Sequence, residues 1–304
     1  MSSSIVLWPI IKALCMASQF IGLDPAGWQS VNQKQQNFLE NHFIKRDEVS
    51  AFADKELQAW ASNDYEYLNA ILKNEGFGIQ LSPFDKDSFG VVSILDVNFQ
   101  WLHKGDETTI VYKNTSYPAV RMDSGFKVFS AENYTQPIVC LETKSNDKVW
   151  MTIADHDTPL QDFELLQWIE SVQKNRVQSK KDYDIVKFPM VDLDQEVNVT
   201  WLVDMTLPGW FIAEALQQTK FKMNNVGAHV KSGFAMSMCR SSGREPIPRV
   251  LTIDQPFYLW IERSGVTVPV FAGYITQQDW KKPENLEFKD DPEDDDDFDH
   301  LFGD

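Results

Sequence analysis

Apolar and polar residues alternate along several short stretches of this chain, with the period of a strand that buries one face. Residues 220–223 alternate Lys with Phe and Met, and residues 89–102 carry apolar side chains at most second positions. Two runs in which almost every residue is apolar, 257–261 and 266–271, are separated by an Arg-Ser-Gly turn at 263–265. These two runs predict a hairpin whose strands are buried on both faces.

A helical period, with apolar residues three or four positions apart, recurs in four other stretches. The stretches with this period are residues 7–20, 30–39, 48–72 and 160–173. Apolar runs at 137–142 and 149–154 lie on either side of a polar turn and predict a second hairpin. Because strand-rich regions precede and follow helical ones, the order of elements predicts an α+β fold.

Three short motifs follow one another in the last third of the chain. The strand at 220–223 leads into Asn224-Asn225-Val226-Gly227, and about twenty residues with the composition of a loop come next. Asp254-Gln255-Pro256-Phe257 then opens the predicted hairpin, which ends in Phe271-Ala272-Gly273. In this order and spacing the motifs resemble the C-terminal end of the serpin family. There a strand ends at a hinge, a long reactive-centre loop follows, and two apolar strands close the chain.

Thinner similarities to serpins extend over most of residues 91–275 and over residues 5–18. The resemblance implies a divergent serpin that is shortened at its N-terminal side. It implies an α+β fold with a large central, mostly antiparallel sheet, a second sheet, and helices packed around both. We expect residues 91–101, 186–191 and 220–223 in the central sheet, and the last hairpin in the second sheet behind it.

The same resemblance divides the chain into two parts. Residues 1–288 are expected to form one serpin-like domain, with a reactive-centre-type loop at about 227–250. Residues 289–304 are expected to be a disordered tail, because residues 290–304 include nine Asp or Glu and no Lys or Arg. About half of the formal net charge of −17 lies in this tail.

Charge and composition exclude several classes of partner. A net charge of −17 argues against nucleic acid, because the phosphates would be repelled. No uninterrupted apolar run reaches about 18 residues, so no membrane contact is expected. Cys15, Cys140 and Cys239 are too few and too scattered for a disulfide framework or a zinc site. Since the N-terminus lacks the positive start of a signal peptide, we expect a cytoplasmic protein.

Residues with catalytic or metal-binding chemistry are sparse. Asp155-His156-Asp157 is the one tight cluster of His and carboxylates, and a polar turn explains it more simply than a metal site. A dyad of His229 and Cys239 is conceivable, but neither residue lies at the kind of element boundary that holds a nucleophile. The sequence contains no Gly-x-Ser-x-Gly, phosphate loop or dinucleotide motif. We therefore predict that the chain is not an enzyme and uses no cofactor or metal.

The serpin resemblance implies a protease inhibitor whose exposed loop is cleaved and then inserts into the sheet as a new strand. The implied hinge residues are Asn224, Asn225, Val226, Gly227, Ala228 and Val230. Loop length counted from Gly227 places the cleaved bond after Ser241, and counting back from Pro256 places it after Glu245. Because Arg240 and Arg244 lie beside these positions, a trypsin-like protease is the expected target.

Departures from the inhibitory pattern leave a second hypothesis open. Inhibitory serpins have acidic residues before the hinge Gly and Thr and Ala after it, whereas this chain has Asn and Val at 225–226 and Ala-His-Val-Lys at 228–231. The alternative is a non-inhibitory binding or assembly protein with the serpin fold. It would dock a basic protein surface through the acidic tail, where Phe298, Leu301 and Phe302 fall on one face of a helical turn.

Overall fold

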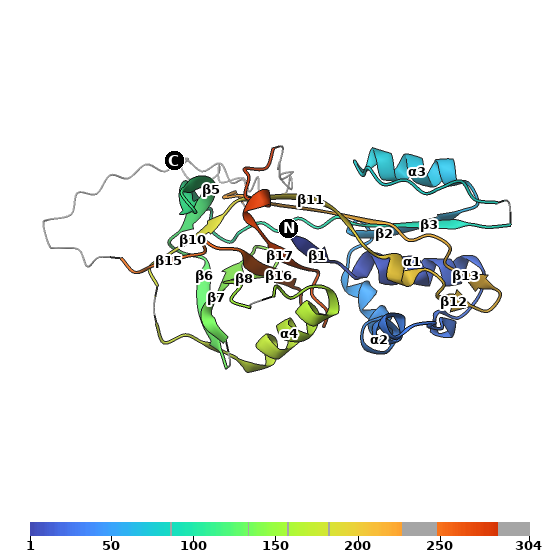
Figure 1. The fold of residues 1–304 in the computed structure, drawn as a ribbon, viewed down its shortest axis with the longest axis horizontal. Coiled ribbons are helices and arrows are strands. Elements are labelled where there is room, and N and C mark those ends of the chain that lie inside the picture. The colour runs from blue at the N-terminus through green and yellow to red at the C-terminus, as the bar shows by residue number, and fades with distance from the viewer. Residues whose placement is uncertain (86, 133, 157, 182, 227–247, 285–304) are drawn as a thin grey trace, which may run out of the picture.

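The computed structural model describes residues 1–284, apart from residues 86, 133, 157, 182 and 227–247. The molecule is elongated (Figure 1). Its two larger sheets lie towards one end, and the N-terminal helices lie towards the other.

Seven strands form the largest sheet, and all its neighbouring pairs are antiparallel. Across the sheet they are β1 (Ser3–Ile5), β17 (Phe271–Ile275), β16 (Phe257–Glu262), β8 (Lys148–Ile153), β7 (Tyr134–Glu142), β6 (Phe126–Ala131) and β9 (Arg176–Gln178). Residues 257–261 of β16 are fully buried between two hydrogen-bonded partners. Trp168 of α4 (Asp162–Asn175) packs on Tyr258 and Trp260 and so covers one face of this strand.

Four strands form a second sheet, in the order β15 (Val250–Thr252), β10 (Ile185–Pro189), β5 (Thr115–Met122) and β4 (Asp106–Tyr112). β4 and β5 form a hairpin whose turn residues, Lys113 and Asn114, both have positive φ angles. Such a turn matches the twist of the two strands that it joins. β10 ends at Pro189, which has no backbone N–H for a further ladder bond.

The remaining strands form three separate pairs. β2 (Leu57–Ser62) pairs with β3 (Gly90–Leu95), β11 (Val191–Val197) pairs with β14 (Gln217–Met223), and β12 (Thr206–Leu207) pairs with β13 (Trp210–Phe211). Each of these pairs is antiparallel.

Local sequence explains where the helices begin. Pro9 lies in the first turn of α1 (Trp8–Phe20), where a missing N–H costs nothing. Asn32 caps α2 (Gln33–Asn41), and Asp64 caps α3 (Tyr65–Asn74) by accepting hydrogen bonds from the first N–H groups of each helix. The short 3-10 helices are η1 (Pro25–Gly27), η2 (Phe43–Ala51), η3 (Thr200–Leu202) and η4 (Gln277–Asp279).

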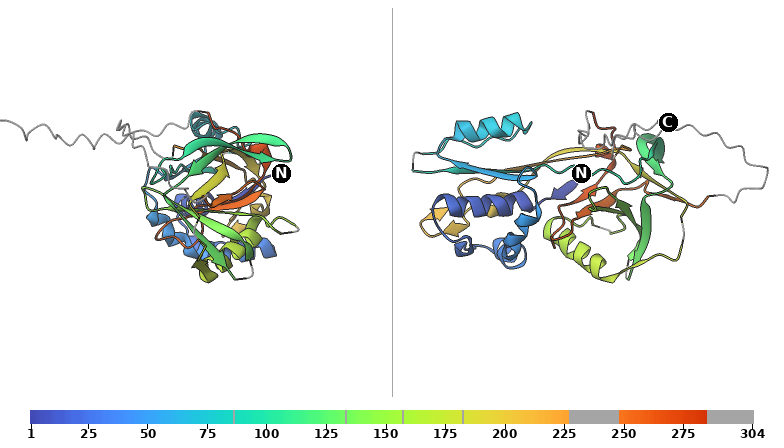
Figure 2. Two further views of the ribbon diagram at one scale, coloured as in Figure 1. Left: turned by 90° about the vertical axis from the view of Figure 1, so that its left-hand side faces the viewer. Right: turned by 180° about the vertical axis from the view of Figure 1, so that it is seen from behind.

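Two helices sandwich the β2–β3 pair. The views in Figures 1 and 2 place α3 on one side of this pair and α1 on the other. Val92 and Ile94 of β3 form a small apolar cluster with Leu68 and Leu72 of α3. Val91 and Leu95, which alternate with them, pack against the main core instead. Both faces of β3 are therefore covered.

The structure confirms the predicted α+β class, because it contains a large antiparallel sheet, further sheets and helices around them. The predicted sheet membership was wrong. Residues 91–101, 186–191 and 220–223 do not share a sheet: they contribute to β3, β10 and β14, which belong to three different ones. The last hairpin belongs to the largest sheet and not to a second one.

Two element boundaries also differ from the prediction. Residues 48–72 contain the end of η2, then β2 and the start of α3, because the cap at Asp64 begins a new helix after a strand. The second strand of the last hairpin is Phe271–Ile275, and residues 263–270 form its connection. Gly265 has a φ of 86° there, and Val268 and Val270 are buried, which explains why the connection resembled a strand.

Candidate functional site

A cavity of about 1160 Å³ separates β3 from β14. Both strands line it, and within the described residues β3 pairs only with β2 and β14 only with β11. Each strand therefore turns one edge without a ladder partner toward the cavity. We call this cavity the slot. An unpaired strand edge presents a row of N–H and C=O groups that can receive another strand.

The floor of the slot is formed by α1. Ile10, Ala13, Leu14 and Ala17 line it from this helix. Two of these four residues are Ala, and their small side chains leave space below the strands. Ile261, Val270 and Phe271 line the slot from the largest sheet. The floor is thus apolar along its length.

β14 forms one wall of the slot with a strict alternation. Thr219 and Met223 are buried, whereas Lys220 and Lys222 are exposed, as the sequence pattern predicts. Phe221 stacks on Phe271 with ring centroids 4.6 Å apart. These contacts fix the inner face of β14 to the core and leave its edge free.

The lower end of β14 is tied to the chain just before α1. Gln217 donates a hydrogen bond from Nε2 to the carbonyl oxygen of Val6, at 2.8 Å. Here the Gln amide links the wall of the slot to its floor.

The part of the predicted hinge that the structure describes directly follows β14 and lies beyond the slot, where Trp101 and Asn224 line a smaller cavity of about 180 Å³. Trp101 donates from Nε1 to the carbonyl oxygen of Asn224, at 2.8 Å. Gly105 N–H donates to the carbonyl oxygen of Asn225, at 3.1 Å, and the Asn225 amide donates back to Gly105 at 3.3 Å. Val226 N–H donates to Oδ1 of Asn224. Asn224 and Asn225 are buried, so the chain is anchored directly before the predicted loop.

The other predicted site residues lie outside the described residues. They are Gly227, Ala228 and Val230 of the hinge, Arg240, Ser241, Arg244 and Glu245 of the scissile region, and Phe298, Leu301 and Phe302 of the tail. His229 and Cys239 also lie there. Their roles remain predictions.

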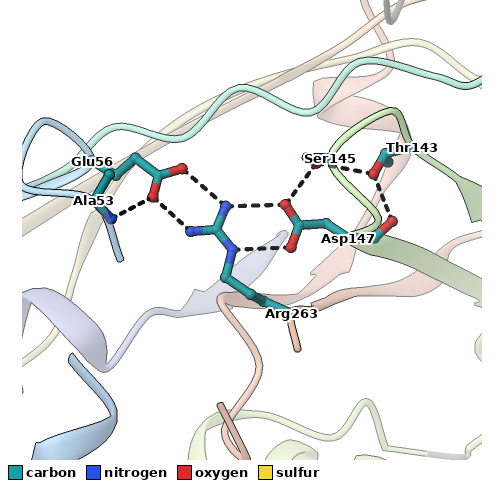
Figure 3. Close-up of polar contacts among 6 residues, drawn as sticks. All are labelled: Ala53, Glu56, Thr143, Ser145, Asp147 and Arg263. Atoms are coloured by element: carbon teal, nitrogen blue, oxygen red, sulfur yellow. Dashed lines mark hydrogen bonds and ion pairs between the residues drawn. The ribbon is translucent and has the colours of Figure 1, made fainter. Parts of the chain in front are cut away.

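An ionic network joins the β2–β3 pair to the largest sheet (Figure 3). Arg263, which follows β16, makes paired hydrogen bonds of 2.9 to 3.0 Å to Asp147 in the β7–β8 turn and to Glu56 directly before β2. Ser145 donates a further bond to Asp147, and Ala53 N–H donates one to Glu56. The side chains of Arg263 and Asp147 are 11% and 4% exposed, so both charges depend on each other for solvation.

Protonation in this network follows from those contacts. Burial works to raise the pKa of Glu56, but the hydrogen bonds from Arg263 and from Ala53 N–H outweigh it and hold the pKa below its ordinary value. Burial works to lower the pKa of Arg263, and its bonds to Asp147 and Glu56 raise it. Glu56 and Arg263 are therefore both charged at neutral pH, and their paired hydrogen bonds hold the start of β2 against the largest sheet.

The predicted cluster around His156 has other contacts. His156 Nδ1 lies 3.2 Å from the Tyr258 hydroxyl and 3.9 Å from Asp155, and its ring packs among Tyr134, Trp168 and Tyr258. Among the described residues no group of three or more His, Cys, Asp or Glu is arranged to hold a metal ion. In the same part of the chain, no helix has the length and apolarity to cross a membrane.

Comparisons with known proteins identify the architecture. No protein-family model matches the chain, and no curated protein matches it. Solved structures match over nearly the whole chain. The mouse protein-Z dependent protease inhibitor has a TM-score of 0.55 and 13% identity, and the match covers 90% of each chain. Native protease nexin-1 with heparin has a TM-score of 0.57 and 15% identity, covering 91% of this chain and 93% of that one. Tengpin, a thermophilic serpin in its native state, has a TM-score of 0.56 and 12% identity, covering 90% and 88%.

This chain has the serpin fold. The resemblance inferred from three short motifs is thereby confirmed at the level of the fold. Sequence reasoning missed the slot between β3 and β14. It also missed the network of Arg263 with Glu56 and Asp147, whose three members lie far apart in the sequence. The charged pair Glu262-Arg263, which follows the apolar run 257–261, was the available signal for Arg263.

Proposed function

We propose that this chain is a serpin-type protease inhibitor whose loop, after cleavage, inserts into the slot between β3 and β14. One observation carries the proposal: in the part of the chain that the structure describes, two strands that each lack a ladder partner on one edge line the same cavity. A strand placed between them would complete both ladders at once. The neighbouring strand pairs and the floor of α1 would remain where they are.

The position of the hinge supports this use of the slot. Asn224, Asn225 and Val226 directly follow β14, which is one wall of the slot. A chain that reversed at these residues would run antiparallel to β14 along its free edge, as a hairpin does. The anchoring of Asn224 to Trp101 holds the start of that reversal just beyond the slot.

The energetics favour a filled slot. About ten new backbone hydrogen bonds, at about 1 kcal/mol net each, would offset part of the entropy cost of ordering the loop, and burial of apolar side chains would add to them. Alternate loop residues Ala228, Val230 and Phe234 supply apolar surface for the floor. We therefore expect the uncleaved form to be held by a kinetic barrier, with a more stable form available after cleavage.

The proposed target is a trypsin-like protease. Arg240 and Arg244 offer the basic side chains that such a protease accepts, and the bond cleaved would follow or adjoin one of them. The protease serine would form an ester with the carbonyl carbon of the cleaved peptide bond, and the new amino terminus would leave. Insertion of the loop would then carry the attached protease away from the hinge.

A mixing experiment tests this function. The chain incubated with trypsin should give an SDS-stable complex with the combined mass of the two proteins, and the cleaved chain should melt on the order of 10 °C higher. The double variant R240A/R244A should lose the complex, whereas the matched variant R249A should keep it. Cleavage without any complex, and without a rise in melting temperature, would contradict the proposal.

A further inference from the structure

The lower end of the slot, beside the β12–β13 pair, is bordered by aromatic side chains from different elements. Phe20 at the end of α1, Phe89 directly before β3 and Trp210 of β13 pack in a row, with ring centroids 4.9 and 5.1 Å apart. Phe84, Phe89, Trp210 and Phe211 all line the slot. Phe20 and Phe211 are exposed. Aromatic faces at this end of the slot are therefore within reach of a ligand from solvent.

Carboxylates lie at the same end. The N–H and the hydroxyl of Ser82 both donate to the carboxylate of Glu214 at 2.9 Å, which joins the segment between α3 and β3 to the residues before β14. Both donors are neutral, so they do not cancel the negative charge of Glu214. Asp87 lines the slot from the same segment, two residues before Phe89. With its neighbours counted, residues 85–87 carry one net negative charge.

Positive charge is scarce in the lining of the slot. Among the described residues that line it, four are Asp or Glu, and Lys220 is the one Lys or Arg. Lys220 lies 3.2 Å from Asp194 of β11 and donates to the carbonyl oxygen of Gly76 at 2.7 Å. Its charge is therefore matched by a carboxylate outside the lining. The charge that remains in the lining is negative.

The inner part of the slot is apolar. Ala13, Ala17 and Ile21 line it from α1 and the residue after that helix, and the buried side chains of Trp28 and Leu202 line it as well. Trp28 donates from Nε1 to the backbone and hydroxyl of two α1 residues, so only its ring remains to contact a ligand. The cavity of about 1160 Å³ is as large as the sites that hold small molecules in proteins.

We propose that the slot binds a small amphiphile that has an apolar body and a cationic ammonium head. The body would lie over α1, and the head would lie at the lower end near Asp87 and Glu214. The faces of Phe89 and Trp210 would attract the same head through their ring quadrupoles. An anionic head, such as that of a fatty acid, would be repelled by the two carboxylates.

This site stands on the cavity, its aromatic border and its charges, and it does not depend on the proposed function. A ligand bound there would occupy the space that the proposed function assigns to a strand. An inhibitor of that type would then be regulated by the amphiphile.

Two amphiphiles with the same alkyl chain test the choice of head group. The full, uncleaved chain is titrated by calorimetry at neutral pH with dodecylamine and with dodecanoate, both below the concentrations at which they form micelles. Dodecylamine should bind with one molecule per chain. Dodecanoate should bind at least about tenfold more weakly, because it exchanges two attractive charge contacts for two repulsive ones.

Three variants locate the ligand. D87N/E214Q should weaken dodecylamine binding about tenfold without weakening that of dodecanoate. The matched variant E40Q/E66Q removes two exposed carboxylates from α2 and α3 and should bind dodecylamine as the parent does, which separates the site from a general attraction to an acidic chain. A17F fills part of the cavity and should weaken both ligands. Thermal melts establish that each variant is folded.

Four results would overturn the proposal. Equal affinity for the two amphiphiles would show that charge does not select the head, and an absence of binding by both would remove the site. Equal weakening by E40Q/E66Q and D87N/E214Q would assign binding to net charge. Unchanged binding by folded A17F would place the ligand outside the slot. Because no protease is present, failure to form a trypsin complex would contradict the proposed function and leave this site intact.

Discussion

The largest sheet and the slot are built from the same kinds of strand but differ in how completely their backbone is paired. β16 has a hydrogen-bonded neighbour on each side, and residues 257–261 are fully buried. Within the described residues, β3 and β14 each have one neighbouring strand, and both line the cavity. The backbone hydrogen bonds of that part of the chain are thus complete in the largest sheet and incomplete beside the slot. Under the proposed function, the first region supplies stability and the second can accept a further strand.

This contrast has a physical basis in side-chain chemistry. Residues 257–261 read Phe-Tyr-Leu-Trp-Ile, and such a strand is stable only when both faces and both edges are covered. β14 reads Gln-Gln-Thr-Lys-Phe-Lys-Met, and the polar side chains of Gln218 and Lys220 bind the backbone of residues 76–78 and Asp194 of β11. A strand that can pair with a further strand must be stable before that strand arrives, and these side-chain contacts stabilise β14.

The largest expected effect is in the completed sheet. Trp260→Ala should lower the free energy of unfolding by about 3–5 kcal/mol, because the ring is fully buried and stacks on Trp150. Phe221→Ala, on the half-buried wall of the slot, should cost less than half as much. Urea unfolding of both variants measures the difference. Equal losses would mean that the slot is packed as tightly as the sheet.

Arg263→Met should cause the next largest loss in the free energy of unfolding. It leaves Asp147 and Glu56 without their partner, and loss of one member of a buried ionic network typically costs about 3 kcal/mol. The matched variant Lys174→Met breaks the exposed pair with Glu170 and should cost under about 1 kcal/mol. Chemical denaturation at neutral pH compares the two. Similar small losses would show that the network does not fix the β2–β3 wall.

His42 lies outside both regions and makes the stability of the whole chain depend on pH. Its contribution must therefore be measured separately from the effects of substitutions in the sheet and the slot. Burial, followed by the positive charge of Lys45, lowers the pKa of His42 from 6.5 to about 4, and its Nδ1 has no hydrogen-bond partner in the described part of the chain. The unfolded chain therefore binds the proton more tightly between these values.

Lowering the pH therefore lowers the free energy of unfolding. The stabilisation is fully present above pH 6.5 and is lost as the pH falls from 6.5 to about 4, by about 1.4 kcal/mol per unit and about 3–4 kcal/mol in total. His42→Phe, in a site between Phe38 and Phe163, should flatten this slope. Melts between pH 7 and 4 measure it. An unchanged slope in the variant would assign the dependence to other groups, such as Glu56.

The smallest expected change in stability has opposite signs in the two regions. Ala13→Leu fills part of the slot from its floor and should stabilise the uncleaved chain by about 1 kcal/mol. Ala272→Leu adds the same atoms to β17, where no space exists, and should destabilise by about 1–3 kcal/mol. Thermal melts of the two variants measure the sign of each change in stability. Destabilisation by both substitutions would mean that the slot cannot take additional side-chain volume.

The sequence predicted those parts of the molecule that depend on local pattern. The apolar run at 257–261 predicted a strand buried on both faces, and the alternation at 220–223 predicted which side chains of β14 are exposed. Three motifs spaced along the last third predicted the serpin fold, which solved structures support at 12–15% identity. Phe257 and Phe271 are buried, as expected.

The sequence could not predict which strand edges stay apart. Pairing between β3 and β14 depends on residues more than a hundred positions apart, and alternation in each strand is the same whether or not they meet. The segment at residues 76–82, which packs beside β14, was missed for a different reason. Residues 76–82 contain two Gly, which suggests a loop, although Phe77, Ile79 and Leu81 alternate as the residues of a covering segment do.

Hydrogen exchange along β3 and β14, measured before and after cleavage of the loop, tests directly whether a strand enters the slot. In the uncleaved chain the amides that face the slot should exchange faster than those of β16, which is paired on both sides. After cleavage by trypsin the account predicts that the slot-facing amides of Gly90–Leu95 and Gln217–Met223 become protected by at least about tenfold, while β16 does not change. If these amides exchange at the same rate before and after cleavage, no strand enters the slot and the account is wrong.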